Sequence, residues 1–439
     1  MKLNLGRDLY LKGRIGWKGL SKDEYLTNSD YKIINATALM DGYVDWNNCG
    51  FITKDRYEES PEIMLQEGDI LISKDGTLGK IGYVKGLTTP CTVASGIFVL
   101  RNSIPEKLNF DYLYHVLKSN IFKDFIQRNK SLGSTILHLY QRDLENFELE
   151  LPSMEHQRSI SGILNAIEDK IANNNKINAE LESLAKTIYD YWFLQFEFPN
   201  EEGKPYKSSG GKMVANEKLN RMIPDGWKNG NLYDIAEFTN GLACQKHRPI
   251  KNNQRLPVIK IREMHNGFTS ETEWVRDDIP QKYVIDDGDI LFSWSATLET
   301  IIWTGGQGAL NQHIFKVSEK NCAKYYVFMQ LAEYVKNFVA MAEARKTTMG
   351  HITSDHLNQS RVVLPCTKVI DSFEQKVTPL FTSIIKNKQE SIELSKLREF
   401  LLPLLMNGQV GFIENEVTIH SRPVGMTSQA GISPLPDRV

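Results

Sequence analysis

The most regular feature of the chain is a hydrophobic stripe at alternating four- and three-residue spacing, and it occurs twice. The first stripe comprises Ile160, Leu164, Ile167, Ile171, Asn174, Asn178, Leu181, Ala185, Ile188 and Trp192. Adding 213 to each number gives the second: Phe373, Val377, Leu380, Ile384, Asn387, Ser391, Leu394, Arg398, Leu401 and Leu405. Both stripes are apolar at their ends and polar at the centre. This spacing predicts two coiled-coil helices, each about 40 residues and roughly 60 Å long.

A mixed α/β pattern precedes each stripe. The first copy has strand-like YKIINATAL and GDILIS and a helical FDYLYHVLKSNIFKDFIQ; the second has strand-like LPVIKI, GDILFS, TIIWT and HIFKV and a helical KYYVFMQLAEYVKNFVAMA. Three landmarks recur in the same order: GDIL at 68 and 288, a basic glycine-containing segment at 130–136 and 346–352, and Leu-Pro at 151 and 364. Their offsets of 213 to 220 positions predict a tandem duplication.

The predicted fold class is α+β, with two tandem mixed α/β domains, each followed by a long helix. We expect the two helices to pair as an antiparallel coiled coil with pseudo-two-fold symmetry. The predicted boundaries are 1–151 (first domain), 152–198 (first helix), 199–222 (linker), 223–364 (second domain), 365–410 (second helix) and 411–439 (irregular tail). Antiparallel pairing would bring Asn174 opposite Asn387 as a polar layer that fixes the register. The simpler alternative is that both asparagines are solvated.

Composition and charge narrow the class of protein. The chain is 41% hydrophobic and 24% charged, its five cysteines are scattered, and it shows neither a membrane-length apolar run nor an apolar N-terminal signal core. We therefore expect a cytoplasmic protein with no membrane partner. The net charge of −2 argues against a simple basic nucleic-acid binder. However, residues 245–262 hold six basic residues and no acid, which suits local DNA binding or a solvated surface.

The sequence does not contain the known catalytic or nucleotide-binding motifs at the spacing that they require. The segment after the first GDIL resembles a phosphate-binding loop, but only two residues separate Gly76 from Gly79, and strand-like IGYV follows Lys80. No nucleophile elbow, HExxH or CxxC occurs, and neither does the cofactor loop or the Asn/Asp-Pro-Pro-aromatic segment of an adenine methyltransferase. The sequence predicts a non-catalytic chain with no metal site and no cofactor of its own.

The combined pattern resembles the specificity subunits of type I restriction–modification systems. The resemblance rests on two globules that carry GDILxS and end in Leu-Pro, a coiled-coil stripe after each, IPDGW at 223–227 and LLPLLMNGQV at the end of the second stripe. It covers residues 5–410, although the first globule lacks an IPxGW opening.

This resemblance implies that each globule is a target-recognition domain that reads one half of a bipartite site in double-stranded DNA. It also implies that the helices set the spacer and dock two modification subunits, which bind S-adenosylmethionine, and that restriction/translocase subunits join the full complex. Two alternatives stay open: a stand-alone or regulatory DNA-binding adaptor, and a coiled-coil scaffold or binder of other ligands.

Loop residues are the candidate DNA contacts, because base edges and phosphates are reached from loops carrying cationic and polar side chains. In the first copy they are Arg14, Lys18, Lys22, Lys74, Thr77, Lys80, Arg128, Lys130, Ser131 and Ser134. In the second they are Lys246, His247, Arg248, Ser293, Trp294, Asn311, Gln312, Arg345, Lys346, Thr347 and His351. Lysine and arginine are expected to contact phosphate more often than bases, and Asn311 and Gln312 carry amides able to pair with adenine.

Overall fold

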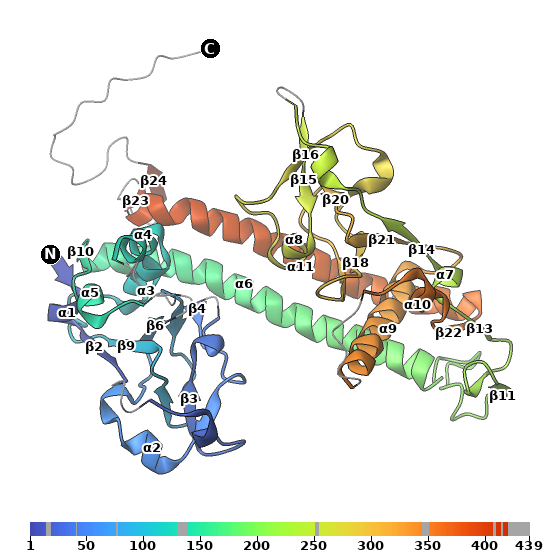
Figure 1. The fold of residues 1–439 in the computed structure, drawn as a ribbon, viewed down its shortest axis with the longest axis horizontal. Coiled ribbons are helices and arrows are strands. Elements are labelled where there is room, and N and C mark those ends of the chain that lie inside the picture. Colours follow the sequence, from blue (N-terminus) through green and yellow to red (C-terminus); the bar gives the residue numbers. More distant parts are fainter. Residues whose placement is uncertain are drawn as a thin grey trace. The chain divides into compact units, whose positions relative to one another are not determined.

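The chain divides into two compact units that both use the long helices. The computed structural model describes residues 1–14, 19–40, 42–75, 78–129, 138–250, 254–344, 351–406, 410–413 and 416–419. Unit 1 combines Met1–Asp169 with Ser395–Val439, and unit 2 is Lys170–Leu394. Helices α6 (Met154–Tyr189) and α11 (Thr367–Met406) each contribute to both units (Figure 1). Each unit is therefore a globular part joined to a section of both helices.

Unit 1 is built on a five-stranded sheet of order β2-β9-β6-β7-β4 and a three-stranded sheet of order β5-β3-β8, with β1 paired to β10. Its strands are β1 (Lys2–Asn4), β2 (Tyr10–Gly13), β3 (Tyr31–Ile34), β4 (Gly42–Tyr43), β5 (Gly50–Ile52), β6 (Ile70–Ser73), β7 (Ile81–Tyr83), β8 (Cys91–Val93), β9 (Ile97–Arg101), β10 (Glu148–Glu150), β23 (Val410–Ile413) and β24 (Glu416–Ile419). Its shorter helices are α1 (Leu5–Asp8), α2 (Lys54–Glu58), α3 (Phe110–Lys118), α4 (Asn120–Asn129) and α5 (Gln141–Glu145).

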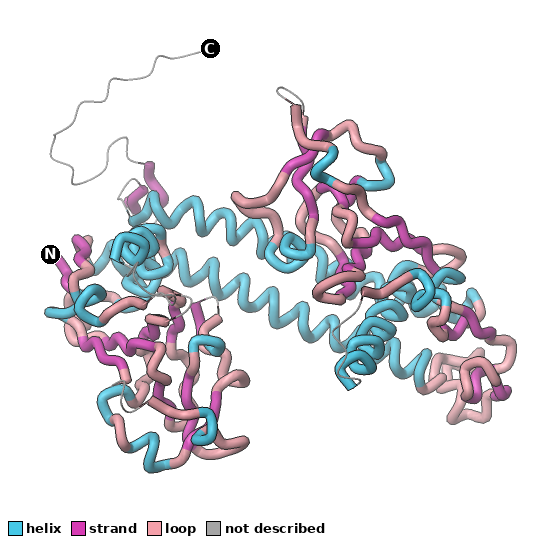
Figure 2. Tube along the Cα trace, in the orientation of Figure 1, coloured by secondary structure: helices cyan, strands magenta, loops and turns pink. Residues whose placement is uncertain are grey.

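Unit 2 repeats this plan with two four-stranded sheets, of order β14-β21-β18-β19 and β16-β15-β20-β17. Its strands are β11 (Met213–Asn216), β12 (Arg221–Pro224), β13 (Lys228–Gly230), β14 (Ala236–Asn240), β15 (Arg255–Ile259), β16 (Trp274–Arg276), β17 (Val284–Ile285), β18 (Ile290–Ser293), β19 (Glu299–Ile302), β20 (Gly308–Leu310), β21 (Ile314–Glu319) and β22 (Val362–Leu364). Its shorter helices are α7 (Leu232–Ile235), α8 (Ile261–Asn266), α9 (Lys324–Ala344) and α10 (Ser354–Asn358). Figure 2 shows the strands of the two larger sheets of each unit gathered in its globular part.

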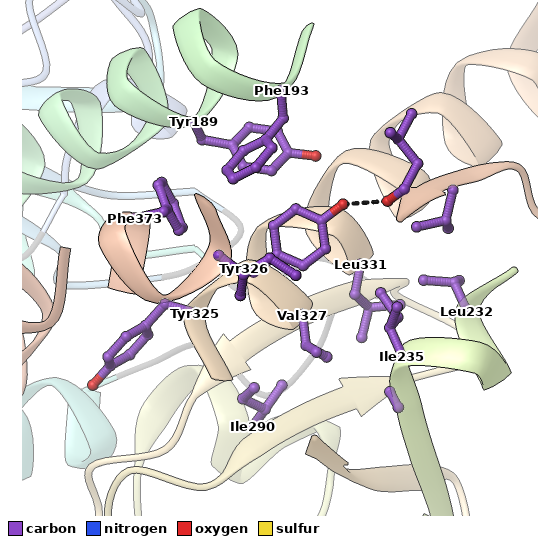
Figure 3. Close-up of a cluster of buried hydrophobic side chains, with 14 of the residues drawn as sticks. Tyr189, Phe193, Leu232, Ile235, Ile290, Tyr325, Tyr326, Val327, Leu331 and Phe373 are labelled. Atoms are coloured by element: carbon purple, nitrogen blue, oxygen red, sulfur yellow. Dashed lines mark hydrogen bonds between the residues drawn. The ribbon is translucent and has the colours of Figure 1, made fainter. Parts of the chain in front are cut away.

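Aromatic side chains join the globular part of unit 2 to its long helices. Tyr189 at the end of α6, Phe193 in the turn that follows it, Phe373 from α11 and Tyr326 from α9 pack together, with the Phe193 and Tyr326 ring centres 4.7 Å apart (Figure 3). The buried Tyr326 hydroxyl donates to the carbonyl of Val363 (Figure 3), so the polar end of the side chain is satisfied inside the core.

Each long helix also caps a shorter helix of the globular part that it supports. In unit 1 the buried Gln157 of α6 accepts a hydrogen bond from the backbone N–H of Asn109, the N-cap residue of α3, at 2.8 Å. In unit 2 the Glu374 carboxylate of α11 accepts from the backbone N–H of Tyr325, at the start of α9, at 3.2 Å. Because these N–H groups have no partner within their own helix, the caps fix the orientation of each globule on its helix.

The two long helices run antiparallel within each unit. In unit 2, Lys170 of α6 lies 3.0 Å from Glu390, whereas Trp192, beyond the end of α6, packs against Phe373 near the start of α11. In unit 1, Glu168 lies 3.4 Å from Arg398, and the more N-terminal Ile160 and Leu164 share a buried cluster with Leu405. The four- and three-residue stripe therefore forms the contact surface between the helices, as predicted.

Three local predictions are corrected by the structure. The long helical pattern of the first globule is broken into α3 and α4, because Ser119 adopts an extended conformation and its hydroxyl donates to the carbonyl of Val116. Helix α6 ends at Tyr189 and continues as a π-helical turn over Asp190–Leu194. The tail predicted to be irregular contains the antiparallel strand pair β23–β24.

Candidate nucleic-acid interface

The repeated GDILxS motif forms the same turn before a central strand in both units. Gly68 and Gly288 have φ angles of +88° and +93°, a conformation that glycine adopts without strain. The carboxylate of the following aspartate closes the turn: Asp69 accepts from the backbone N–H of Gln66 at 2.8 Å, and Asp289 accepts from that of Asp286 at 2.9 Å. The glycine and the aspartate are therefore structural residues.

The final serine of the motif fixes the loop after the strand. The buried Ser73 hydroxyl accepts from the backbone N–H of Lys80 at 2.8 Å, and the buried Ser293 hydroxyl accepts from that of Glu299 at 3.1 Å. Each hydroxyl thus closes the hairpin loop between β6 and β7, or between β18 and β19. The motif holds the two ends of the loop and leaves the side chains between them free to differ.

Three chain segments meet at this hairpin loop in each unit, and we call the meeting point the junction. In unit 1 the junction consists of Lys74, Gly96 and the pair His138–Leu139; in unit 2 it consists of Trp294, His313 and the pair His351–Ile352. The same backbone bonds build both. Lys74 N–H donates to Gly96 at 2.8 Å and Trp294 N–H to His313 at 3.4 Å, while Leu139 N–H donates to Lys74 and Ile352 N–H to Trp294, each at 3.0 Å.

The junction of unit 1 carries a cation and an acid–histidine pair. His138 Nδ1 lies 2.6 Å from Asp75 Oδ1, and both side chains are about 40% exposed, at 40% and 38%. The Lys74 ammonium lies 4.8 Å from the centre of the Phe98 ring, and burial lowers its pKa. Lys80, at the other end of the loop, is half-buried.

The junction of unit 2 is aromatic. The Trp294 ring centre lies 5.7 Å from that of His313 and 5.6 Å from that of His351, and its indole N–H donates to Asn240 at 3.2 Å. Gly241, which follows Asn240, packs closely against the Asn311 backbone, because a Cβ there would lie 2.1 Å from the Asn311 carbonyl oxygen. Identical backbone bonds therefore present different chemistry in the two units.

The predicted contact residues differ in exposure. Lys22, Arg128, Lys246, Arg248 and His351 are exposed, and Lys74, Lys80, His247, Trp294 and Gln312 are half-buried. Lys18, Thr77, Lys130, Ser131, Ser134, Arg345, Lys346 and Thr347 lie outside the described residues. The structure brings Lys74, Trp294 and His351 to the junctions, and Gln312 adjoins His313.

Arg14, Ser293 and Asn311 are buried, and the structure corrects their assignment as DNA contacts. Arg14 Nε donates to the Val93 carbonyl at 3.0 Å, and burial lowers the pKa of its guanidinium. Ser293 closes its hairpin loop. Asn311 accepts from the backbone N–H of His313 at 3.3 Å. Their polar groups bond inside the fold and are not presented at the surface.

Three residues in or beside the junctions were missing from the sequence prediction, namely Asp75, His138 and His313. The signal for His138 was present, because it lies 213 positions before His351, which is the offset between the two helical stripes. Asp75 and His313 could be found only from the backbone pairing that places them beside these histidines.

A polar layer occupies the centre of the helix pair in unit 2. Asn174 is buried and its Nδ2 donates to Glu390 Oε2 at 2.8 Å, while Asn387 O lies 3.4 Å away. The Asn387 amide donates to Asn178 Oδ1 at 2.9 Å. Asn174 and Asn387 therefore lie in one layer, and the side-chain partner of Asn387 is Asn178.

The part of the chain that the structure describes contains no group of three or more histidine, cysteine or acidic side chains placed to hold a metal. Its helices include none long and apolar enough to cross a membrane.

Comparison with known proteins identifies relatives over most of the chain. A family model described as "Type I restriction modification DNA specificity domain" matches residues 16–183 and again residues 224–394. The type I restriction enzyme MjaIX specificity subunit of Methanocaldococcus jannaschii is 26% identical over 370 residues, covering 82% of this chain and 81% of that protein. The HindI specificity subunit of Haemophilus influenzae is 22% identical over 405 residues, covering 79% and 87%.

A solved structure shares the fold. The S subunit of the type I restriction–modification system from M. genitalium aligns with a TM-score of 0.55 at 15% identity, covering 92% of this chain and 95% of that chain.

Proposed function

Because this chain belongs to the type I restriction–modification DNA specificity family, we propose that its two junctions read the two halves of a bipartite target in double-stranded DNA. The observation that carries the proposal is the repeated backbone with exchanged side chains: Lys74 and His138 in one junction correspond to Trp294 and His351 in the other. A shared scaffold with different side chains at the surface suits recognition of two unlike half-sites.

On this proposal the chain recognises the target sequence and performs no chemical step itself. Methyl transfer and cleavage belong to partner subunits, with S-adenosylmethionine bound by two modification subunits, and restriction/translocase subunits complete the complex. Such a complex would work in the cytoplasm, where the genomic DNA of a prokaryotic cell is found.

The long helices set the spacing between the half-sites. Helix α6 has 36 residues and α11 has 40, which correspond to about 54 Å and 60 Å at 1.5 Å per residue. The polar layer around Asn174 and Asn387 fixes the register of this pair, because a heptad shift would bury amides opposite apolar side chains. On this proposal the domains are those expected from the sequence, with the two recognition domains ending at residues 151 and 364.

Exposed apolar side chains on the outer faces of these helices are the proposed docking surface for the modification subunits. Ile177, Leu184 and Tyr191 follow one another at seven-residue spacing in unit 2 and are 38%, 48% and 39% exposed. Leu397 and Phe400 of α11 are 45% and 65% exposed in unit 1. Leu184 and Leu397 are 213 positions apart, so the repeat offers an equivalent residue to each of two identical partners.

A binding titration tests the proposal. The full chain, alone and co-produced with its modification subunit, is titrated with a duplex library at several salt concentrations. We expect one bipartite duplex to bind in preference, with an affinity that falls steeply as salt rises. A complex that binds every duplex equally, or none, would refute the proposal.

A further inference from the structure

The β15–β16 ribbon of unit 2 has one buried face and one exposed face. Val258 and Val275 are buried in a small core beneath the ribbon. Arg255 pairs with Arg276 and Pro257 with Trp274 in the register of the two strands. Since side chains alternate across a strand, Trp274 and Arg276 lie on the side opposite Val275. Figure 1 shows the ribbon at the end of the domain remote from α9 and α10.

Arg255 and Trp274 form a stacked pair on the exposed face. The guanidinium carbon lies 4.5 Å from the centre of the indole ring, Arg255 is exposed, and Trp274 is 39% exposed. Among the described residues, Arg255 has no carboxylate at ion-pair distance, and the Trp274 indole N–H has no acceptor. The Arg255 guanidinium and the Trp274 indole N–H thus lie side by side at the surface, and no described residue offers either of them an acceptor.

The neighbouring cations of the ribbon differ from Arg255 because carboxylates hold them. Arg276 Nε lies 2.8 Å from Asp278, and Lys260 is bound by Glu273. The backbone N–H of Arg276 also donates to His247 at 3.0 Å, which holds the exposed Lys246 and Arg248 segment beside the ribbon. The exposed Lys246 and Arg248 therefore lie on a segment that is bonded to the ribbon, while Asp277 and Asp278 directly follow its second strand.

Unit 1 repeats the arrangement on the equivalent strands. Strand β3 pairs parallel with β8 and antiparallel with β5, as β15 pairs parallel with β20 and antiparallel with β16. There the Lys32 ammonium lies 6.0 Å from the Phe51 ring, and it also donates to the Trp46 carbonyl at 3.1 Å. A cation over an aromatic ring is thus present in both copies, but only the copy in unit 2 leaves it without an oxygen partner among the described residues.

We propose that the stacked Arg255–Trp274 pair is a phosphate clamp that grips the DNA backbone beside the half-site read by unit 2. Stacking on the ring holds the planar guanidinium so that its N–H groups point outward in the fork that matches a phosphate. The indole N–H supplies another donor, and the ring face packs on the adjoining sugar. A two-stranded ribbon is also narrow enough to follow a DNA groove. The inference rests on the proposed DNA-reading function and adds to it a site away from the junction.

The clamp is tested with the full chain in complex with its modification subunit. Arg255→Ala and Trp274→Ala are compared with Lys282→Ala, which removes an exposed cation lying 5.0 Å from the Tyr283 ring. Lys282 lies in the turn before β17, the strand at the edge of the sheet opposite β16. We expect Arg255→Ala to weaken binding of the specific duplex about tenfold and to reduce the salt slope by about one phosphate contact, with the target sequence unchanged. Arg255→Lys should recover only part of the loss, and Lys282→Ala should match the wild type.

Two outcomes would overturn the clamp while leaving the proposed function intact. If both ribbon variants bind and discriminate DNA as the wild type does, the ribbon does not touch the duplex. If Arg255→Ala changes which bases are selected, or weakens retention of the modification subunit at an unchanged salt slope, the ribbon reads bases or docks protein instead. A wild-type complex that shows no sequence preference would instead refute the proposed function itself. Circular dichroism melts confirm that each variant is folded.

Discussion

Arg101 holds the Asp69 carboxylate at two points, with Nε 2.7 Å from Oδ1 and Nη2 2.7 Å from Oδ2. The aspartate side chain is 1% exposed, and the arginine also donates to the carbonyl of Met64 at 2.8 Å. In unit 2 the equivalent Asp289 binds Lys316 at 2.7 Å and is 24% exposed. In both units the aspartate of GDILxS therefore fastens the turn to a neighbouring strand.

We predict that Asp69→Ala lowers the free energy of unfolding of unit 1 by about 3 kcal/mol, because it leaves a partly buried guanidinium without its carboxylate. Asp289→Ala should cost unit 2 less, about 1 kcal/mol, since the pair there is more exposed to solvent. Urea denaturation of the full chain, with a probe in each unit, measures both values. Equal losses, or no loss for Asp69→Ala, would contradict this assignment.

Two substitutions in the polar layer of the helix pair should change the stability of unit 2 in opposite directions. Asn174 Oδ1 is buried and has no hydrogen-bond partner among the described residues, so Asn174→Leu should stabilise unit 2 by about 1 kcal/mol. Asn387→Leu instead removes the donor to the buried Asn178 Oδ1 and should destabilise it by about 1–3 kcal/mol. Calorimetric melting measures the two changes. Shifts in the same direction would show that the hydrogen bonds of this layer do not decide its stability.

Burial lowers the pKa of His115 below its ordinary value of 6.5, and its Nε2 lies 2.8 Å from Asn165 Oδ1. Below about pH 6.5 the unfolded chain therefore binds a proton that the folded unit excludes. The free energy of unfolding of unit 1 should fall as the pH falls through this range, and the fall should stop below the folded pKa. The adjacent Glu168, whose pKa is lowered from 4.5, titrates at lower pH.

His115→Gln should flatten this dependence below about pH 6.5. His156→Gln is the matched control, because His156 is an exposed histidine on α6 of the same unit. Urea midpoints at half-unit pH intervals measure the slope. A slope that survives in His115→Gln would assign the dependence to other groups.

The proposed docking surface predicts that a charge on the apolar stripe releases the modification subunit. Leu184→Glu and Phe400→Glu should each weaken retention of that subunit about tenfold or more, because a charge would be desolvated at an apolar contact. Ser183→Glu is the control, because it adds the same charge at the exposed residue just before Leu184, about 100° away around the helix. Analytical ultracentrifugation of the complexes separates the outcomes. If Ser183→Glu disrupts assembly equally, the effect is one of charge and not of the stripe.

The sequence predicted the parts of the fold that depend on periodicity, and it missed the parts that depend on long-range packing. The stripe placed Asn174 and Asn387 in one layer, but the stagger that directs the Asn387 amide to Asn178 follows from the packed helices. Arg14 looked like a surface cation because nothing nearby in sequence shows that Val93 accepts its Nε–H. Ser293 looked like a loop residue because the hairpin that it closes exists only after strand pairing.

The β23–β24 pair was predictable in principle. VGFI and EVTI are two short runs of β-forming residues separated by two positions, which is the pattern of a hairpin. The adjacent methionine, asparagine and glycine and the irregular composition beyond residue 420 obscured it.

Mapping adenine methylation in cells that carry the chain and its modification subunit tests most directly whether each junction reads its own half-site. Trp294→Ala and Lys74→Ala are compared with the wild type. We predict that Trp294→Ala alters the bases accepted in one half of the methylated sequence and that Lys74→Ala alters only the other half, with the spacer unchanged in both. If both substitutions alter the same half, or if neither changes the methylated sequence, the assignment of one junction to each half-site is wrong.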